Sequence, residues 1–554
     1  MTGSTSPDSN SHPQASAKKG ANEDAQSPQS GGAGDGFSSR WGLVVAALGM
    51  AVGAGNIWRF PRMAAQHGGG AFLLLWLAFT VLWSIPLLMT EFAMGKKTRK
   101  GPVGAFGLLL GKRWAWMGGF VAVCTLAIMF YYSVVTGWSA WYFLACLFKF
   151  GQISGDADTA WSTLTQGSWV AVVFQFVAAG GCGLLLIKGV ASGIERICKV
   201  LVPVLTVLLV VAAVRGLTLP GGIEGLEFLF HVDPDKLTRS ETWLQALSQS
   251  AWSTGAGWGL IVTYASYARR DEDVGLNSLI TAVGDNSASV LAAMAILPAI
   301  FALSGSTEQA LAVTGSDNTG MAFVWMPRLF GRLPAGGSFF AALFFLALTA
   351  ASASSLLAMM EMGTRVLVDF GLSRKKALGF ITGGCLLFGL PSALSMKVFL
   401  NQDWVWGLGL LLSGVLFAIA VIRYGPRRFR ETLINGDDPD WRVGRWFEVV
   451  VKWVLPLEFV VLMSWWFYQS ATKFSKGETL NPFSSFSVAT VLLQWGVVLV
   501  VGVMASATLH RLVVRADERL GGGPHQDAHE DAHEDPQKDA QKDAQEDDTE
   551  EDLL

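Results

Sequence analysis

Residues 49–61 read Gly-Met-Ala-Val-Gly-Ala-Gly-Asn-Ile-Trp-Arg-Phe-Pro, and their Gly-Ala-Gly lies in the middle of an otherwise apolar segment. Glycine costs a helix interior roughly 1 kcal/mol relative to alanine, so this segment is predicted to be a helix with a break. Gly255-Ala256-Gly257 repeats the feature five apolar segments later. Two such interruptions at corresponding positions indicate inverted repeats around a binding site at the bilayer midplane. The alternative is that the glycines serve only close helix packing.

The composition indicates a membrane protein rather than a soluble enzyme. Of the 554 residues, 51% are hydrophobic and only 15% are charged, whereas an average globular protein has roughly 25% charged residues. Twelve apolar segments have about the length that spans a bilayer, roughly 20 residues. They are residues 41–66, 70–94, 114–148, 168–187, 195–215, 243–268, 276–304, 338–369, 377–395, 402–423, 446–470 and 487–513. We therefore expect an all-α polytopic membrane protein with 12 transmembrane helices.

The basic residues predict how these helices are oriented. Twelve spans put both chain ends on one side, and the basic clusters all fall in even-numbered connections. The clusters are Lys96 to Lys100 with Lys112 and Arg113, Arg269 with Arg270, Arg374 to Lys376, and Arg423 to Arg430. Connections rich in lysine and arginine stay in the cytoplasm. Both termini are therefore predicted to be cytoplasmic, in a cell (plasma or inner) membrane.

The two ends of the chain differ from the apolar body. Residues 1–36 are rich in Ser, Gly, Gln and Asn and are predicted to be a disordered tail. Residues 515–554 are predicted to be an acidic low-complexity tail, because residues 527–554 hold 13 acidic and 2 basic residues. The rest of the chain then has 39 basic and 31 acidic residues. The predicted transporter domain is residues 37–514, with repeats at about 41–215 and 243–423 and two further helices at about 446–513.

Two ionisable residues lie within or next to the predicted membrane segments. Arg59 follows the first break by about one helical turn, and Asp285 interrupts the seventh apolar segment. Ionisable residues inside a membrane are costly and usually functional, so both are candidate site residues. Alternatively, Arg59 extends to the membrane interface beside Trp58, and Asp285 makes only structural hydrogen bonds.

Together these stretches resemble the signature of the neurotransmitter:sodium symporter family, most closely its prokaryotic amino-acid-transporting members. The matching stretches are Gly55-Asn56-Ile57-Trp58-Arg59-Phe60-Pro61, Gly68-Gly69-Gly70-Ala71-Phe72, Phe130-Tyr131-Tyr132, Gly193-Ile194-Glu195-Arg196, Ile261-Val262-Thr263-Tyr264-Ala265-Ser266-Tyr267 and Ala351-Ser352-Ala353-Ser354-Ser355. The resemblance covers roughly residues 37–510. It implies a fold of 5+5 inverted repeats with broken helices 1 and 6, plus two C-terminal helices.

The resemblance also implies two sodium sites. The first would use the Ala51 carbonyl, Asn56, Ser253 and Asp285, and the second would use the carbonyls of Gly49, Val52 and Ala351 with the hydroxyls of Ser354 and Ser355. Sodium is satisfied by oxygen ligands, and unwound backbone supplies them without adding net charge. Without the resemblance, the two serines would be expected only to bond their own helix backbone.

For the substrate, the resemblance implies an amino acid. Amides around Ala54 and Gly55 with the Tyr132 hydroxyl would hold its carboxylate, and carbonyls of Ala51, Trp252 and Ser253 would accept from its ammonium group. The pocket for its side chain would be lined by Val52, Ile128, Trp252, Gly255, Trp258, Ser355 and Met359. Amine-transporting members carry an aspartate at the position of Gly53, so the glycine favours an amino acid over a monoamine. The apolar lining favours a hydrophobic or aromatic side chain.

The family resemblance also implies an outer and an inner gate that close the two sides of the substrate site. Arg59 would pair with Asp403 across the outer vestibule, while Tyr131, Tyr132 and Trp258 would cap the substrate. Asp369 would belong to the inner gate. The family's arginine and tryptophan partners are replaced there by Gly34 and Phe37, which leaves Arg40 as a substitute partner.

Departures from the family pattern concern chloride. Asp285 stands where most members have an asparagine ligand of the first sodium, and Trp76 replaces a tyrosine that helps to hold chloride. Gln249, Ser253 and Ser289 of that chloride site remain, and chloride-independent members place a carboxylate at the position of Ser289. Because Asp285 lies one helical turn away, we expect it to supply the negative charge, so that chloride is not required. A buried carboxylate can also take up a proton, which would make the sodium affinity depend on pH.

The sequence therefore predicts a sodium-coupled symporter that imports an amino acid by alternating access. The alternatives are a proton-coupled amino-acid permease with Asp285 as the proton carrier, and a transporter-like sensor that binds without translocating. No enzymatic activity is expected, since no nucleophile–base pair, phosphate loop or metal-ligand cluster stands out. Two sodium ions, an amino-acid substrate and the lipid bilayer are the expected partners, without nucleic acid, and the oligomeric state stays open.

Overall fold

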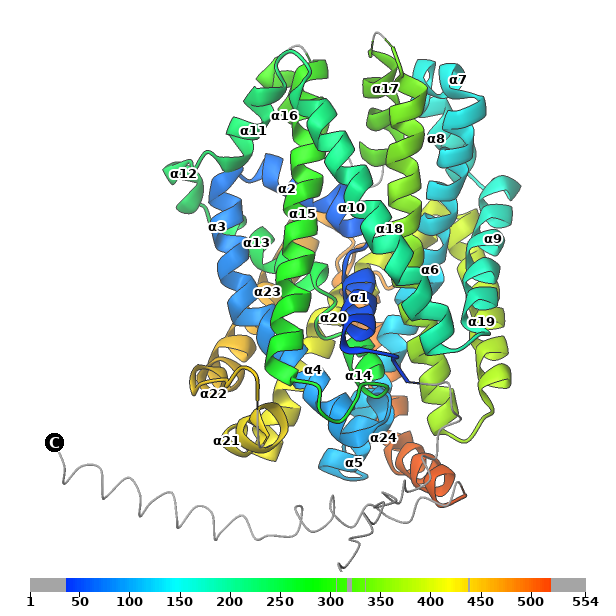
Figure 1. The fold of residues 1–554 in the computed structure, drawn as a ribbon, viewed down its shortest axis with the longest axis vertical. Coiled ribbons are helices and arrows are strands. Elements are labelled where there is room, and N and C mark those ends of the chain that lie inside the picture. The colour runs from blue at the N-terminus through cyan, green and yellow to red at the C-terminus, as the bar shows by residue number, and fades with distance from the viewer. Residues whose placement is uncertain (1–35, 305, 316–320, 334, 437–438, 520–554) are drawn as a thin grey trace, which may run out of the picture.

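The structure is a computed structural model that describes residues 36–304, 306–315, 321–333, 335–436 and 439–519. Within these ranges the regular structure is helical, apart from one β-bridge between Gly69 and Val232. The predicted N-terminal tail lies outside the described residues except for Gly36. The predicted acidic tail lies outside them beyond Arg519, where the last helix ends. The helices form a single upright bundle (Figure 1).

Most of the predicted membrane segments are present as long helices. Among the described residues, nine helices are long and apolar enough to cross a membrane, and the bent pair α1 (Arg40–Ala51) and α2 (Ala54–Gln66) makes a tenth. The nine are α3 (Gly70–Phe79) continued by η1 (Thr80–Ser84) and α4 (Ile85–Thr98), α6 (Ala115–Phe148), α9 (Trp169–Leu186), α10 (Arg196–Leu217) with the end of η2 (Val190–Glu195), α15 (Val274–Ser304), α18 (Gly337–Asp369), α19 (Arg374–Leu394), α20 (Met396–Tyr424) and α24 (Val488–Arg519). The predicted all-α membrane architecture is confirmed.

Two predicted segments are not among these ten. The sixth is split into α13 (Ser240–Ser253) and α14 (Leu260–Ala265). The eleventh consists of α22 (Trp446–Val449), η5 (Val450–Val454), α23 (Leu455–Gln469) and η6 (Ser470–Phe474). Both regions are helical, and the total of twelve spans stays a prediction.

Short elements cover the two ends of the bundle. They are α5 (Pro102–Leu110), α7 (Phe150–Gly155), α8 (Ala157–Thr165), α11 (Gly222–Phe230), α12 (Pro234–Leu237), α16 (Thr307–Gly315), η3 (Met321–Trp325), α17 (Met326–Gly331), α21 (Pro426–Arg428) and η4 (Phe429–Asn435). In Figure 1, α16, α17 and α7 lie at the upper end, and α5, α21 and α22 lie at the lower end.

Both predicted interruptions are present, and their backbones differ. The first break consists of Val52 and Gly53 in non-helical conformations, and the axes of α1 and α2 differ by 53°. The second break contains Gly255, Gly257 and Gly259 with φ of 70°, 87° and 74°. Residues other than glycine are strained at such positive φ angles. The glycines therefore specify the second break directly.

Candidate functional site

The first break exposes backbone amides that two side chains satisfy. The Asn56 side-chain oxygen accepts a 2.9 Å hydrogen bond from the Gly53 amide. The Tyr132 hydroxyl, from α6, accepts a 3.2 Å hydrogen bond from the Ala54 amide. N–H groups at the start of a helix have no acceptor within the helix, and anions are commonly bound there.

A buried polar cluster joins this break to α13 and α15. The Asn56 amide nitrogen donates to an Asp285 carboxylate oxygen at 2.7 Å and to the Ser289 hydroxyl at 2.8 Å. The Ser253 hydroxyl donates to the other Asp285 oxygen at 2.7 Å. The Asp285 side chain is fully buried. The fold thus brings together three of the four residues predicted for the first sodium site, while the fourth, Ala51, is the last residue of α1.

The residues predicted for the second sodium site lie where α18 meets the end of α1. The Ser355 hydroxyl donates to the Met50 carbonyl at 3.0 Å, and the Ser354 hydroxyl donates to the Ala351 carbonyl at 2.9 Å. Gly49 faces α10, because a Cβ atom there would lie 2.7 Å from the Cys198 sulfur. Both serines therefore bond carbonyls of the predicted site region, one of them across the helix interface.

Gly53 occupies a position that has no room for a side chain. A Cβ atom at Gly53 would lie 2.8 Å from the Ser355 hydroxyl oxygen and 3.2 Å from the Tyr132 hydroxyl oxygen. Real Cβ atoms essentially never approach another heavy atom to 2.8 Å. A larger residue at Gly53 would therefore require the Ser355 side chain to shift.

The predicted walls of the side-chain pocket are buried. Ile128 and Met359 are fully buried and Trp258 is 8% exposed. The Trp252 and Trp258 rings meet edge to face at 6.3 Å, and a Cβ atom at Gly255 would lie 3.1 Å from the Met50 sulfur. The predicted lining is thus mostly apolar and largely enclosed.

At the predicted outer gate, Arg59 contacts α13. Its guanidinium donates to Gln249 and, at 3.2 Å, to the Ser248 hydroxyl, and it lies 5.9 Å from the Trp252 ring centre. The Asp403 carboxylate instead interacts with the Tyr131 hydroxyl and, electrostatically, with Arg59. The predicted Arg59–Asp403 relationship is thus one of nearby charges rather than a direct ion pair between these described residues.

The predicted inner gate residue Asp369 is the last residue of α18. Its carboxylate accepts from the Gly101 amide at 2.7 Å and pairs with Arg365 at 3.1 Å and with Lys100 at 4.0 Å. Arg40, the expected substitute partner, instead pairs with Asp440 at 2.8 Å. Basic residues on α18 and in the connection after α4 thus take the role that the sequence suggests for Arg40.

Sequence reasoning missed Glu91, which supports the second break. It is fully buried in α4, and one carboxylate oxygen accepts from the Gly257 amide. Its other oxygen has no hydrogen-bond partner among the described residues. A lone glutamate within the apolar segment 85–95 was the available signal. Glu91 therefore holds the backbone of the second break in place through the Gly257 amide.

The chain matches a family of known proteins over most of its length. The model of the sodium:neurotransmitter symporter family matches residues 35–163 and 159–515. An uncharacterised sodium-dependent transporter of Methanocaldococcus jannaschii is 32% identical over 406 residues, which are 70% of this chain and 80% of that protein. The uncharacterised sodium-dependent transporter YhdH of Bacillus subtilis is 31% identical over 372 residues, 65% of this chain and 79% of that protein.

A solved structure is similar over nearly all of its length. The crystal structure of MhsT in complex with L-phenylalanine has a TM-score of 0.67 and 28% sequence identity. The match covers 78% of this chain and 99% of MhsT. The overall fold of the present chain is therefore shared with a protein crystallised with an amino acid.

Proposed function

The chain belongs to the sodium:neurotransmitter symporter family, and from this premise we propose that it is a sodium-coupled symporter that imports a hydrophobic or aromatic amino acid. The observation that carries the proposal is the buried cluster of Asn56, Ser253 and Asp285 beside the first break. This cluster offers carboxylate, amide and hydroxyl oxygens next to the backbone amides at the start of α2, which Asn56 and Tyr132 now bond. It thus combines features suited to a cation and to an anionic group in one place.

The donor set suits sodium as the coupling ion. The first site comprises the Ala51 carbonyl, Asn56, Ser253 and Asp285, and the second comprises the carbonyls of Gly49, Val52 and Ala351 with the hydroxyls of Ser354 and Ser355. All of these ligands are oxygens, and only Asp285 carries a charge. Two sodium-dependent relatives support the choice of ion.

Two ions provide much more driving force than one. A tenfold gradient is worth about 1.4 kcal/mol per ion, and a potential of about 100 mV adds about 2.3 kcal/mol. Two sodium ions then supply about 7.4 kcal/mol, which supports roughly a 10⁵-fold accumulation of a zwitterion. One ion supports only about 500-fold accumulation.

The lack of space at Gly53 supports an amino acid as the substrate. A side-chain carboxylate at this position would have to displace the Ser355 hydroxyl, which supports a substrate that brings its own carboxylate. The Ala54 and Gly55 amides with the Tyr132 hydroxyl would receive it. Ile128, Trp252, Gly255, Trp258, Ser355 and Met359 would enclose the side chain. MhsT, which was crystallised with L-phenylalanine, supports an apolar substrate.

Transport would proceed by alternating access between two gates. Arg59, Asp403 and Tyr131 would close the outer side, and Asp369 would close the inner side. We further propose that both termini are cytoplasmic, that residues 37–514 form the transporter domain in a cell membrane, and that chloride is not required because Asp285 supplies the negative charge.

Uptake into proteoliposomes tests the proposal. A panel of labelled amino acids is offered with an inward sodium gradient, and then with choline in place of sodium. We expect accumulation of a hydrophobic or aromatic amino acid only with sodium. Accumulation driven by a proton gradient alone would instead identify a proton-coupled permease with Asp285 as the carrier. Binding without accumulation would identify a sensor.

A further inference from the structure

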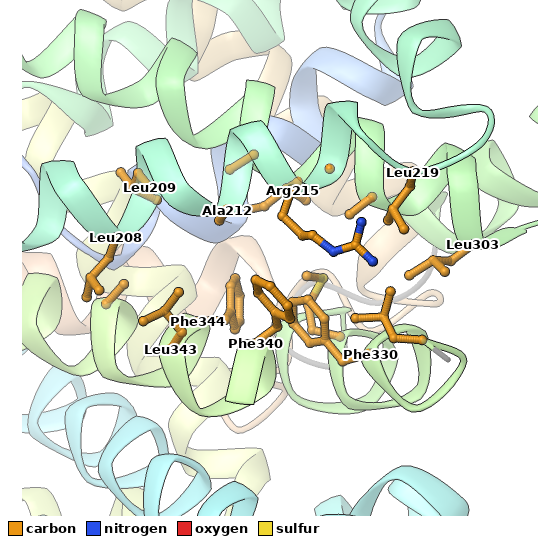
Figure 2. Close-up of a pocket in the computed structure, with 17 residues that line it drawn as sticks. Leu208, Leu209, Ala212, Arg215, Leu219, Leu303, Phe330, Phe340, Leu343 and Phe344 are labelled. Carbon is orange, nitrogen blue, oxygen red and sulfur yellow. The ribbon is translucent and has the colours of Figure 1, made fainter. Parts of the chain in front are cut away.

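An apolar groove lies between α10, α15, α17 and α18 (Figure 2). The space between the atoms of its lining, open solvent included, is about 580 Å³. Seventeen residues line it, and none of them belongs to the candidate substrate, sodium or gate residues. Arg215 is the one charged residue among these seventeen. A single cation in an otherwise apolar lining requires an explanation.

Arg215 is positioned to bind an anion in the groove. Its guanidinium extends from the last turn of α10 into the space above Phe340 and Phe330 (Figure 2). It lies 5.8 Å from the centre of the Phe340 ring and donates to the Thr218 hydroxyl at 3.2 Å. No carboxylate pairs with it among the described residues. Because a guanidinium has five N–H donors, most of them stay available to a ligand.

The groove borders the lipid-facing side of the bundle. On α10, Val207, Val210 and Val214 are 59%, 44% and 56% exposed, and such valines on a membrane helix face lipid tails. On the opposite side, Gly216 lets α10 approach α15 closely, since a Cβ atom there would lie 3.2 Å from Pro298. The groove is therefore closed by α15 behind it and lies beside the lipid-exposed face of α10.

The groove is elongated in the direction that a membrane lipid would take. Helix α10 lines it from Leu208 to Gly216, a rise of about 12 Å at 1.5 Å per residue. Arg215 lies in the last turn of α10, at the end where the span meets the polar zone of a bilayer. Leu208 and Leu343 line the groove at its other end, toward the middle of the span (Figure 2). A charged end at the interface and an apolar end inside match a phospholipid.

We propose that this groove binds an anionic phospholipid, with the phosphate on Arg215 and one acyl chain alongside Leu208, Leu343 and Phe344. Lipid tails are as apolar as leucine side chains, so insertion of the tail alone selects no particular lipid. The headgroup decides the selectivity, because arginine and phosphate form strong charge-assisted hydrogen bonds. A zwitterionic headgroup would bring an ammonium group close to the guanidinium, which favours a headgroup with net negative charge.

Photolabelling in a membrane tests the site. The full-length protein is placed in nanodiscs of phosphatidylcholine that contain a small fraction of phosphatidylglycerol with a photoreactive diazirine on one acyl chain. After irradiation, labelled peptides are identified by mass spectrometry. We expect labels on the peptides of α10 and α18 that line the groove. Unlabelled phosphatidylglycerol should compete with this labelling, whereas additional phosphatidylcholine should not.

Matched variants separate the groove from general attraction of anionic lipid. Arg215→Gln should reduce groove labelling roughly tenfold, and Arg215→Lys should retain most of it. Arg423 is the control, since it also lies in the last turn of a spanning helix and stacks on an aromatic ring, that of Trp114 at 4.3 Å. Arg423→Gln should leave groove labelling unchanged. Ala212→Phe should reduce labelling by filling the groove while Arg215 is retained.

Three results would overturn the proposal. One is equal competition by phosphatidylcholine, which would mean that the headgroup charge is not recognised. Another is an equal loss of groove labelling in Arg215→Gln and in the control Arg423→Gln, which would mean that any basic residue near the interface has the same effect. The third is unchanged labelling in either Arg215→Gln or Ala212→Phe, because the phosphate would then not lie on Arg215, or the groove would not be the labelled site.

Discussion

The Asn56 side-chain amide donates a 2.7 Å hydrogen bond to the Asp285 carboxylate, and through it the broken first span is joined to α15. The oxygen of the same amide accepts from the Gly53 backbone. Asn56 therefore connects a buried negative charge directly to the backbone at the break. A change of charge at Asp285 should therefore alter binding at both the proposed sodium site and the proposed substrate site.

Replacing Asp285 by asparagine should make transport depend on chloride. The variant removes the negative charge while it retains an oxygen for sodium and for the Ser253 hydroxyl, which now donates to Asp285 at 2.7 Å. A mobile anion near Ser253 and Ser289 would then have to replace the lost charge. Sodium-driven uptake is measured with chloride and with gluconate as the anion.

The control for this experiment lies on the same helix. The Ser287 hydroxyl bonds the Val283 carbonyl on an exposed face of α15, so Ser287→Ala should transport equally well with either anion. If Asp285→Asn also transports equally well in gluconate, the carboxylate does not substitute for chloride.

Replacing Gly53 by alanine should weaken binding of the amino acid. The new Cβ atom would press on the Ser355 and Tyr132 hydroxyls, and overpacking of this kind costs about 1–3 kcal/mol. The affinity should then fall roughly 5- to 150-fold. Equilibrium binding of the labelled substrate measures the loss.

A second glycine provides the comparison. Gly180 lies within α9, and a Cβ atom there would meet no other atom within 4 Å. Gly180→Ala should therefore bind and transport like the unmodified protein. Equal affinities of the two alanine variants would mean that the narrow space at Gly53 has no role in binding.

The sequence predicts the residues near the breaks better than it predicts their partners. Asn56, Ser253 and Asp285 are predicted to share a site, and they are hydrogen-bonded to one another. The resemblance to the family implies this shared site, whereas position alone marks only Arg59 and Asp285, because ionisable residues inside a membrane are rare and usually functional. The family resemblance relates positions as far apart as Asn56 and Asp285, which 229 residues separate.

Partners of long flexible side chains are less predictable. Arg59 reaches Gln249 rather than forming a direct pair with Asp403, and Arg40 pairs with Asp440 rather than with Asp369. An arginine side chain has several rotatable bonds and can reach acceptors on different helices. Which acceptor it bonds therefore depends on how the helices around it pack. The role of Glu91 is hard to predict for a related reason. Its partner is the backbone amide of Gly257, which is available only because the second break is not helical.

Replacing Tyr132 by phenylalanine should also weaken substrate binding. The hydroxyl now accepts from the Ala54 amide, and in the proposed site it would donate to the substrate carboxylate. Hydrogen bonds to charged groups contribute about 1.5–3 kcal/mol, so the affinity should fall roughly tenfold or more. The Tyr142 hydroxyl, on the same helix, has no hydrogen-bond partner among the described residues. Tyr142→Phe should therefore leave the affinity unchanged, and equal effects of both variants would contradict the assigned role of Tyr132.

Replacing Asp369 by asparagine should open the proposed inner gate more often. The carboxylate holds Arg365 and Lys100 beside the Gly101 amide, and removing one partner of a buried ion pair is strongly destabilising. Cys198 can report the opening, because its sulfur faces Gly49 of the proposed second sodium site and the residue is 1% exposed.

The reaction rate of Cys198 with a membrane-impermeant maleimide is measured in inside-out vesicles, with the other four cysteines changed to serine. Asp369→Asn should increase the rate several-fold, and sodium should reduce it in the unmodified background by stabilising the closed site. Asp271, which pairs with Arg269 on the exposed surface, provides the control, since exposed pairs contribute about 0–1 kcal/mol. Asp271→Asn should leave the rate unchanged. A rate in Asp369→Asn no higher than in this control would show that Asp369 does not hold the inner gate closed.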